Sequence, residues 1–352
     1  MKYYAYFCRV NYNSHQEIRL NPIHMPIEVD ILEDSIFRLS PELLNILLID
    51  RTTSREDNPC NIFWATSDYE HLGKGYEYKS PILPELITGK NGHVIMPRVL
   101  KRRDLQRERS RQKAEVFTPS WVCNLQANTV DSSWFGREDV FNHENDDHTW
   151  TTNTEKITFP EGKTWHDYVR SNCLEITCGE APYLVSRYDT TTGQPITLEN
   201  RIGLLDRKLR VVNENTETSG DWLKWTKVAF QSTYGYEWQG DSLFIARENM
   251  LMTFIEYYQA RFNRAPQLKS LLNIANIISW NLWQMDGLKC VIPDSCGMKP
   301  SAEQSLFDEP KLVPCEGCKT GNMHRHNGIY CKIMDWQKHE VLTFVSMLKE
   351  KK

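Results

Sequence analysis

The sequence has no long hydrophobic run and no surplus of positive charge. Its longest apolar stretch near the start, residues 43–49, is interrupted by Asn45 and ends before Asp50, far short of the ~20 residues that cross a bilayer. Residues 1–4 lead into a mixed polar stretch and not into the apolar segment of a secretory signal. We therefore expect a cytoplasmic protein without a membrane segment.

Charge and cysteine content narrow the class further. Lys and Arg number 42 against 46 Asp and Glu, which gives a net charge of −4. This balance excludes a globally basic nucleic-acid coat but permits a local basic patch. Ten cysteines in 352 residues favour core residues, metal ligands or incidental thiols over a disulfide scaffold.

The chain divides into three expected parts. Residues 1–100 form an N-terminal α+β region, residues 101–300 a cofactor-binding domain, and residues 301–352 a small Cys/His-rich tail. In the first part Ser40, Pro41 and Glu42 precede apolar residues at helical spacing, and this pattern predicts a helix that begins at Pro41.

A basic run lies between residues 101 and 113. It carries seven basic residues against Asp104 and Glu108, a local surplus of about five charges that suits contacts with DNA phosphates. The alternative is a solvated helix face with pairs at i,i+4. The candidate DNA-binding residues are Lys101, Arg102, Arg103, Arg107, Arg109, Arg111 and Lys113.

Two sequence blocks follow the basic run. The first, residues 115–119, reads EVFTP and comes directly before a helical pattern that Pro119 can start. The second, residues 174–184, reads LEITCGEAPYL, which is typical of a strand that runs into a tight turn. The glycine of such a turn lets a ligand approach the backbone closely.

Two further blocks complete the pattern. Residues 233–238 predict a strand that ends at Glu237, where doubly wound folds place the acid that accepts hydrogen bonds from ribose hydroxyls. Gly179 and Glu237 are 58 positions apart, and the helical spacing of residues 202–212 indicates that one long helix fills much of this insertion. Residues 277–288 read as a buried strand that ends in Asp286.

In this order the four blocks resemble N6-adenine DNA methyltransferases, the modification subunits of type II restriction–modification systems. The resemblance covers about half of the chain and implies an α/β fold with a Rossmann-like S-adenosylmethionine-dependent methyltransferase core. It departs from the family loop at Glu175, Thr177, Glu180, and residues 181–182. The cofactor-binding residues that it implies are Phe117, Thr118, Pro119, Glu175, Cys178, Gly179, Glu237 and Asp286.

The family's catalytic tetrapeptide, (D/N/S)PP(Y/F/W), is missing. The nearest sequence, Asn58-Pro59-Cys60-Asn61, lacks the second proline and the aromatic ring that stacks on the flipped adenine. The catalytic residues are therefore unknown. The expected function is S-adenosylmethionine and double-stranded DNA binding related to adenine-N6 methylation. The alternatives are a non-catalytic regulatory or specificity subunit, one half of a split methyltransferase with a catalytic or restriction-nuclease partner, and a chain that stops before its catalytic half.

The tail carries a possible zinc site. A CxxC pair is followed by two histidines and a third cysteine, a set that suits tetrahedral zinc, while the alternative is a glycine-rich turn with incidental thiols. Cys290 and Cys296 are either further ligands or core residues. The candidate ligands are Cys315, Cys318, His324, His326 and Cys331.

Overall fold

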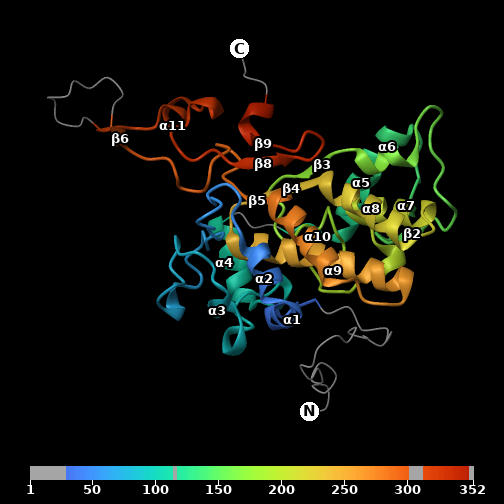
Figure 1. Cartoon of the computed structure of the whole chain (residues 1–352), viewed down its shortest axis with the longest axis horizontal. Coiled ribbons are helices and arrows are strands. Elements are labelled where there is room, and N and C mark those ends of the chain that lie inside the picture. Colours follow the sequence, from blue (N-terminus) through green and yellow to red (C-terminus); the bar gives the residue numbers. More distant parts are fainter. Residues whose placement is uncertain (1–28, 114–116, 301–311, 349–352) are drawn as a thin grey trace.

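The computed structural model describes residues 29–113, 117–300 and 312–348. These parts form a mixed α/β structure with small sheets, as the sequence predicts (Figure 1). The α-helices are α1 (Glu33–Leu39), α2 (Pro41–Leu48), α3 (Pro84–Ile87), α4 (Arg103–Lys113), α5 (Ser120–Phe135), α6 (Trp165–Arg170), α7 (Leu204–Asn215), α8 (Ser219–Gln231), α9 (Gly240–Phe262), α10 (Leu268–Asn281) and α11 (Glu316–Thr320). The strands are β1 (Asn142–Glu144), β2 (Trp150–Thr152), β3 (Cys173–Glu175), β4 (Thr233–Glu237), β5 (Leu282–Gln284), β6 (Lys299–Pro300), β7 (Leu312–Val313), β8 (Lys332–Asp335) and β9 (Glu340–Thr343).

A parallel sheet of order β3-β4-β5 lies at the centre. Glu175 is in register with Gly235, and Glu237 is in register with Gln284, so each strand ends in a polar side chain at the same edge of the sheet. Parallel strands require a crossover between them, which α7 and α8 provide before β4, and α9 and α10 before β5. This topology gathers three distant segments at one edge.

The two faces of the sheet are covered differently. Figure 1 shows α9 and α10 on one side and β8 and β9 on the other. Leu282 belongs to the main core together with residues of α9 and α10. Tyr236 and Trp283 instead form a second core with Ile333 of β8 and with Phe344. Neighbouring residues of a strand point to opposite faces, so this division follows from the alternation of side chains along β4 and β5.

The N-terminal region packs into the main core. Leu43 and Trp64 are fully buried in the same cluster as Phe244 of α9. The guanidinium of Arg247 donates to the carbonyl oxygens of Leu47 and Ile49. Residues 31–100 therefore share one hydrophobic core with residues 135–282, and the predicted helix at Pro41 is confirmed as α2.

Two expectations about secondary structure are wrong. The insertion before β4 holds two helices, α7 and α8, because Thr218 caps a new helix by accepting the N–H of Asp221. Residues 277–281 end helix α10, and the strand begins only at Leu282. A short apolar run does not distinguish a buried helix from a buried strand, which explains the second error.

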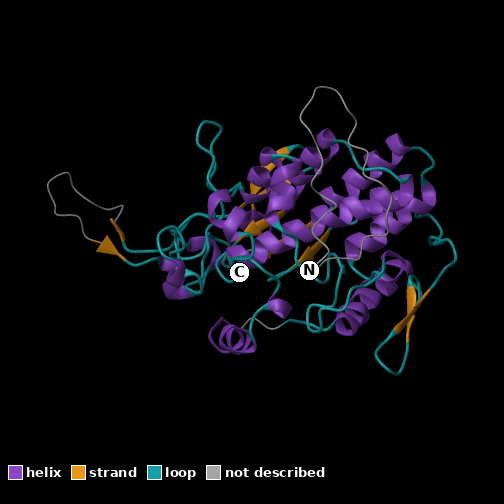
Figure 2. Ribbon diagram, turned by 90° about the horizontal axis from the view of Figure 1, so that it is seen from below, coloured by secondary structure: helices purple, strands orange, loops and turns teal. Residues whose placement is uncertain are grey.

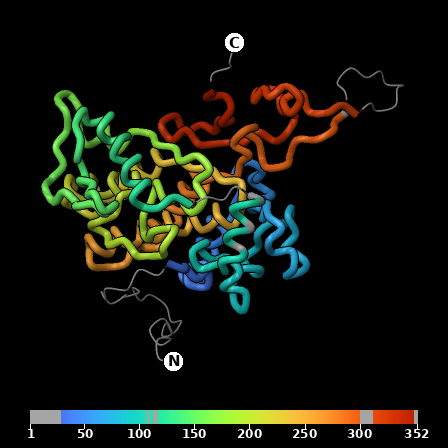
Figure 3. The backbone as a smooth tube through the Cα atoms, turned by 180° about the vertical axis from the view of Figure 1, so that it is seen from behind, coloured from blue at the N-terminus to red at the C-terminus, as the bar shows by residue number. Residues whose placement is uncertain are grey.

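The peripheral segments lie at opposite ends of the long axis. The β1–β2 hairpin projects at one end, and the β6–β7 pair projects at the other (Figure 2). Figure 3 shows the tail, residues 312–348, running along one side of the molecule. Ile333, Phe344 and Val345 of this tail belong to the second core. Within the described ranges, no helix combines the length and the apolar character that a membrane crossing needs.

Candidate cofactor site and metal centre

The loop after β3 folds tightly over the end of β4. Thr177, Gly179 and Ala181 have positive φ angles of 47°, 52° and 65°. The N–H of Cys178 donates to the carbonyl of Tyr236 at 2.8 Å, and the N–H of Gly179 donates to Oε2 of Glu237 at 2.9 Å. The predicted glycine turn is thus confirmed, and it brings the second and third sequence blocks into contact.

The first sequence block lies beside this loop. A Cβ atom placed on Gly179 would be 3.6 Å from Cε1 and Cζ of Phe117, so the ring faces the glycine at van der Waals distance. Thr118 accepts a hydrogen bond from Thr190 through its carbonyl, and Pro119 immediately precedes α5. Glu115 and Val116 lie outside the described residues.

Two buried carboxyl groups stand at the ends of neighbouring strands. Glu175 and Glu237 are each 8% exposed. Glu175 accepts the N–H groups of residues 183 and 184, and Glu237 accepts those of residues 179, 238 and 239.

Burial raises the pKa of both carboxyl groups, and it raises the pKa of Glu175 well above its ordinary value. These N–H groups oppose the rise, and the charge of Glu237 raises the pKa of Glu175 further. In the parts of the chain that the structure describes, neither carboxyl group has an ion-pair partner. The pair therefore favours a ligand that brings donors or positive charge.

Asp286 has a partner of its own. It is 4% exposed and follows β5, as expected from the sequence. Its Oδ2 pairs with Nζ of Lys289 at 2.9 Å, and its Oδ1 accepts the N–H of Leu288 at 3.0 Å. A Cβ atom on Gly287 would come within 2.6 Å of the Tyr236 ring, so glycine is required for the chain to leave β5 so close to β4.

Sequence reasoning missed a polar network at the same edge. Nε1 of Trp238 donates to the hydroxyl of Tyr78 at 3.2 Å, and that hydroxyl donates to Asp294 at 2.7 Å. Burial and the Asp294 carboxylate raise the pKa of Tyr78 to about 12. Gln284 at the end of β5 also bonds to the backbone of Phe63. Neither Tyr78 nor Phe63 lies in a motif, so no local signal marks them.

The basic run contains two kinds of cation. Arg102, Arg103, Arg107 and Arg111 are exposed, with Arg102 paired to Asp104 at 2.8 Å, and α4 ends at Lys113. Lys101 and Arg109 are buried, with side chains 7% and 2% exposed. The prediction that these two residues contact DNA is wrong, because each forms a buried ion pair with Asp241.

Four thiol and imidazole groups of the C-terminal part converge on one point. The ligand atoms of Cys296, Cys315, Cys318 and His326 all lie within 4.8 Å of one another. Nδ1 of His326 is 3.6, 3.5 and 3.6 Å from the three sulfur atoms in that order. Bonds of about 2.3 Å to sulfur and about 2.0 Å to nitrogen give a tetrahedron with S–N edges of about 3.5 Å. The cluster therefore has the dimensions of a tetrahedral metal site and could hold a metal ion.

Glycines allow this close approach. A Cβ atom on Gly317 would come within 2.7 Å of the His326 ring, and one on Gly328 within 2.9 Å of the Cys296 sulfur. The N–H of Asn327 donates to the Cys315 sulfur at 3.2 Å. Burial opposes ionisation of Cys315, but this N–H and the neighbouring donors outweigh it and lower the pKa of the thiol to about 6.

Two predicted ligands belong elsewhere. Cys331 is fully buried in the second core, and its sulfur faces the carbonyl of Gln284 at 3.4 Å. His324 lies in the turn Met323–Arg325, outside the cluster. Cys296 takes the place of Cys331, because backbone pairing of residues 291–292 with residues 329–330 carries the Cys296 loop next to His326.

The segment that most resembles the catalytic tetrapeptide, residues 58–61, begins in an exposed turn. Asn58 is exposed, and its backbone exchanges hydrogen bonds with Arg55 at 3.1 and 3.2 Å.

Comparison of the chain with protein families, with curated proteins and with solved structures found no match.

Proposed function

We propose that the chain binds S-adenosylmethionine at the carboxyl edge of the β3-β4-β5 sheet and is a DNA methyltransferase-like subunit. The observation that supports this most is the placement of Glu175 and Glu237 on adjacent parallel strands beneath the loop of Gly179. In open α/β sheets, ligands bind outside the carboxyl ends of the strands. S-adenosylmethionine carries a sulfonium and an ammonium charge, and such charges would relieve the unpaired burial of two carboxyl groups.

The residues of the chain have distinct tasks in this proposal. Glu237 accepts hydrogen bonds from ribose hydroxyls, as the corresponding acid does in doubly wound folds. Gly179 and Phe117 line the approach to the loop, and Glu175 fixes the loop by accepting the N–H groups of residues 183 and 184. The cofactor, when bound, would supply the methyl group.

Calorimetry with S-adenosylmethionine tests this proposal. A hydrogen bond to a charged group contributes about 1.5–3 kcal/mol, so Glu237→Gln should weaken binding by about ten- to a hundredfold. Glu199→Gln is a matched control, since Glu199 is exposed and lies in a separate turn. The absence of heat with the unchanged chain at millimolar cofactor would contradict the assignment.

One half of a split methyltransferase is the second candidate. Among the described strands, none pairs with the outer edge of β3, where Leu174 and Ile176 are 41% and 64% exposed. Parallel strands are normally buried on both faces, so an exposed apolar edge strand favours a partner chain. A cavity of about 590 Å³ extends from β3 across the face of the sheet toward the tail, and its lining includes Leu174, Tyr234 and Trp336.

Size-exclusion chromatography with the product of the neighbouring gene tests the split-enzyme candidate. A complex should form with the unchanged chain and should be lost with Ile176→Glu. Val130→Glu is the control, because Val130 is 54% exposed and lies on α5, which is not part of the β3-β4-β5 sheet. Equal binding of both variants would remove the β3 edge from the interface.

We further propose that the metal of the Cys296–Cys315–Cys318–His326 cluster is zinc. Three thiolates and one imidazole in a closed tetrahedron are typical of structural zinc sites, which lack an open coordination position. The site joins the loop after β5 to the segment that carries α11. Its expected task is therefore to hold the tail against the sheet, and metal removal should loosen the tail and leave the main core folded.

A further inference from the structure

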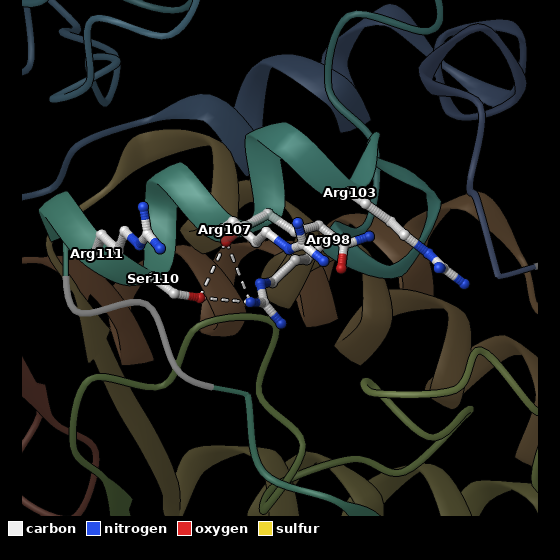
Figure 4. Close-up of a pocket in the computed structure, with 6 residues that line it drawn as sticks. Arg98, Arg103, Arg107, Ser110 and Arg111 are labelled. Carbon is white, nitrogen blue, oxygen red and sulfur yellow. Dashed lines mark hydrogen bonds between the residues drawn. The ribbon is translucent and has the colours of Figure 1, made fainter.

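An arginine-lined pocket lies between α4 and the segment that precedes it (Figure 4). Its volume is about 450 Å³. None of the described residues that line it is acidic. The lining residues are Arg98, Arg103, Gln106, Arg107, Ser110 and Arg111.

Three of these arginines follow one stripe of the helix. Arg103, Arg107 and Arg111 are spaced four positions apart, so their side chains are neighbours about 6 Å apart along the axis. Like charges at this spacing destabilise a helix by a few tenths of a kcal/mol per pair. An anion that bridges them removes this repulsion, and the guanidinium fork matches phosphate geometry.

Arg98 connects the pocket to the loop of the cofactor site. Its Nη2 donates to Oγ of Ser110 at 2.7 Å, and its guanidinium carbon lies 5.1 Å from the centre of the Phe117 ring. Its backbone N–H donates to the carboxylate of Glu180 at 2.6 Å. Phe117 faces Gly179, and Glu180 follows Gly179 in the sequence. Arg98 therefore contacts both α4 and the glycine loop.

We infer that this pocket binds a backbone phosphate of duplex DNA and that Arg98 couples phosphate binding to cofactor binding. The inference rests on the proposed cofactor site and adds the position of the DNA contact and its effect on that site. A phosphate that binds Arg98 and Arg107 fixes the Arg98 guanidinium in its position between Ser110 and Phe117. Because Phe117 lies against Gly179, DNA and S-adenosylmethionine then stabilise the same arrangement, and by linkage each raises the affinity for the other.

Fluorescence anisotropy with a labelled duplex tests the pocket. The double variant Arg107→Gln, Arg111→Gln should bind at least about tenfold more weakly, and the slope of log K against log salt should fall by about two. The control is Arg264→Gln with Lys269→Gln, which removes the same charge from exposed residues near α10. Thermal unfolding of both variants checks the fold. Equal duplex affinity of the two double variants would overturn the proposal that this pocket binds a DNA phosphate.

Calorimetry with and without saturating duplex tests the coupling. S-adenosylmethionine should bind at least about fivefold more tightly to the duplex complex, the lower end of typical coupling. In Arg98→Lys, which keeps the charge but loses the planar group over Phe117, this gain should disappear. Equal cofactor affinity in both conditions would overturn the coupling alone. If the chain binds no cofactor at all, the proposed function and the coupling both fail, and the anisotropy result still decides the pocket.

Discussion

We expect Arg109→Met to lower the free energy of unfolding and to leave the affinity for duplex DNA unchanged. The guanidinium of Arg109 is 2% exposed and bonds to Asp68 at 2.6 Å and to Asp241 at 3.0 and 3.3 Å. Burial opposes ionisation of Asp241, but the charges of Arg109 and Lys101 outweigh it and hold the pKa of Asp241 far below its usual range. The variant leaves this buried carboxylate with one cation fewer.

The magnitude follows from the partners that remain. Removing one partner of a buried ion pair costs about 3–5 kcal/mol, and the lower value applies because Lys101 stays 3.0 Å from Asp241. An unfolding entropy of about 2.1 cal/mol/K per residue over the whole chain turns about 3 kcal/mol into a Tm lower by about 4 °C. The depressed pKa of Asp241 contributes stability that is present above its ordinary pKa of 3.8 and is lost as the pH falls below that value, so the difference in Tm should narrow below about pH 4.

Calorimetric unfolding at pH 7 and duplex anisotropy measure the two effects side by side. Arg107→Met is the matched control on the same helix, because its side chain is exposed and lines the arginine pocket. Arg107→Met should change Tm by less than about 1 °C and weaken duplex binding. A loss of duplex affinity at unchanged Tm in Arg109→Met would show instead that Arg109 contacts DNA.

Three further predictions concern the metal, the pH dependence and the reaction. About one equivalent of zinc should co-purify with the chain and be lost in Cys296→Ser but retained in Cys331→Ala; metal analysis showing the reverse would restore Cys331 as a ligand. Burial, with the charges of Asp30 and Asp34, raises the pKa of Glu33 to about 9, so the folded state binds this proton more tightly than the unfolded state. The free energy of unfolding should therefore fall as the pH rises from about 4.5 to 9. Urea unfolding of Glu33→Gln should give a flatter profile, and an unchanged slope would contradict this origin. The chain alone should transfer no methyl group to DNA, since its sequence lacks the (D/N/S)PP(Y/F/W) tetrapeptide that supplies the stacked ring and the polar acceptors. Tritium incorporated from labelled cofactor into genomic DNA would disprove this, and Asn58 would then be the first residue to replace.

Local signals predicted the elements at which short stretches of sequence decide the conformation. The start of α2 follows from a proline at the first helical position, and the turn at Gly179 follows from a glycine after an apolar strand. The strand that ends at Glu237 was also predicted, because its apolar and polar residues are followed directly by a long helix. These features depend on neighbours within a few residues.

The errors came from contacts between distant residues. Lys101 forms a buried ion pair with Asp241, and Arg109 pairs with both Asp68 and Asp241. Asp241 lies 132 positions from Arg109 in the sequence. The sequence does not show which acids pair with these cations, so a run of basic residues predicts an exposed, positively charged surface. Cys296 precedes the CxxC pair by 19 positions and reaches His326 only through strand-like pairing of the backbone. The spacing of short zinc motifs therefore predicts Cys331 as a ligand, but Cys331 is buried in the second core.

We propose that Glu237 and the Gly179 loop hold S-adenosylmethionine. A crystal structure of the chain grown with S-adenosylhomocysteine, the stable product of methyl transfer, tests it most directly. We predict that both ribose hydroxyls lie within hydrogen-bond distance of the Glu237 carboxylate and that the ligand contacts the backbone at Gly179. A ligand bound elsewhere, or an empty sheet edge at saturating ligand, would contradict the account.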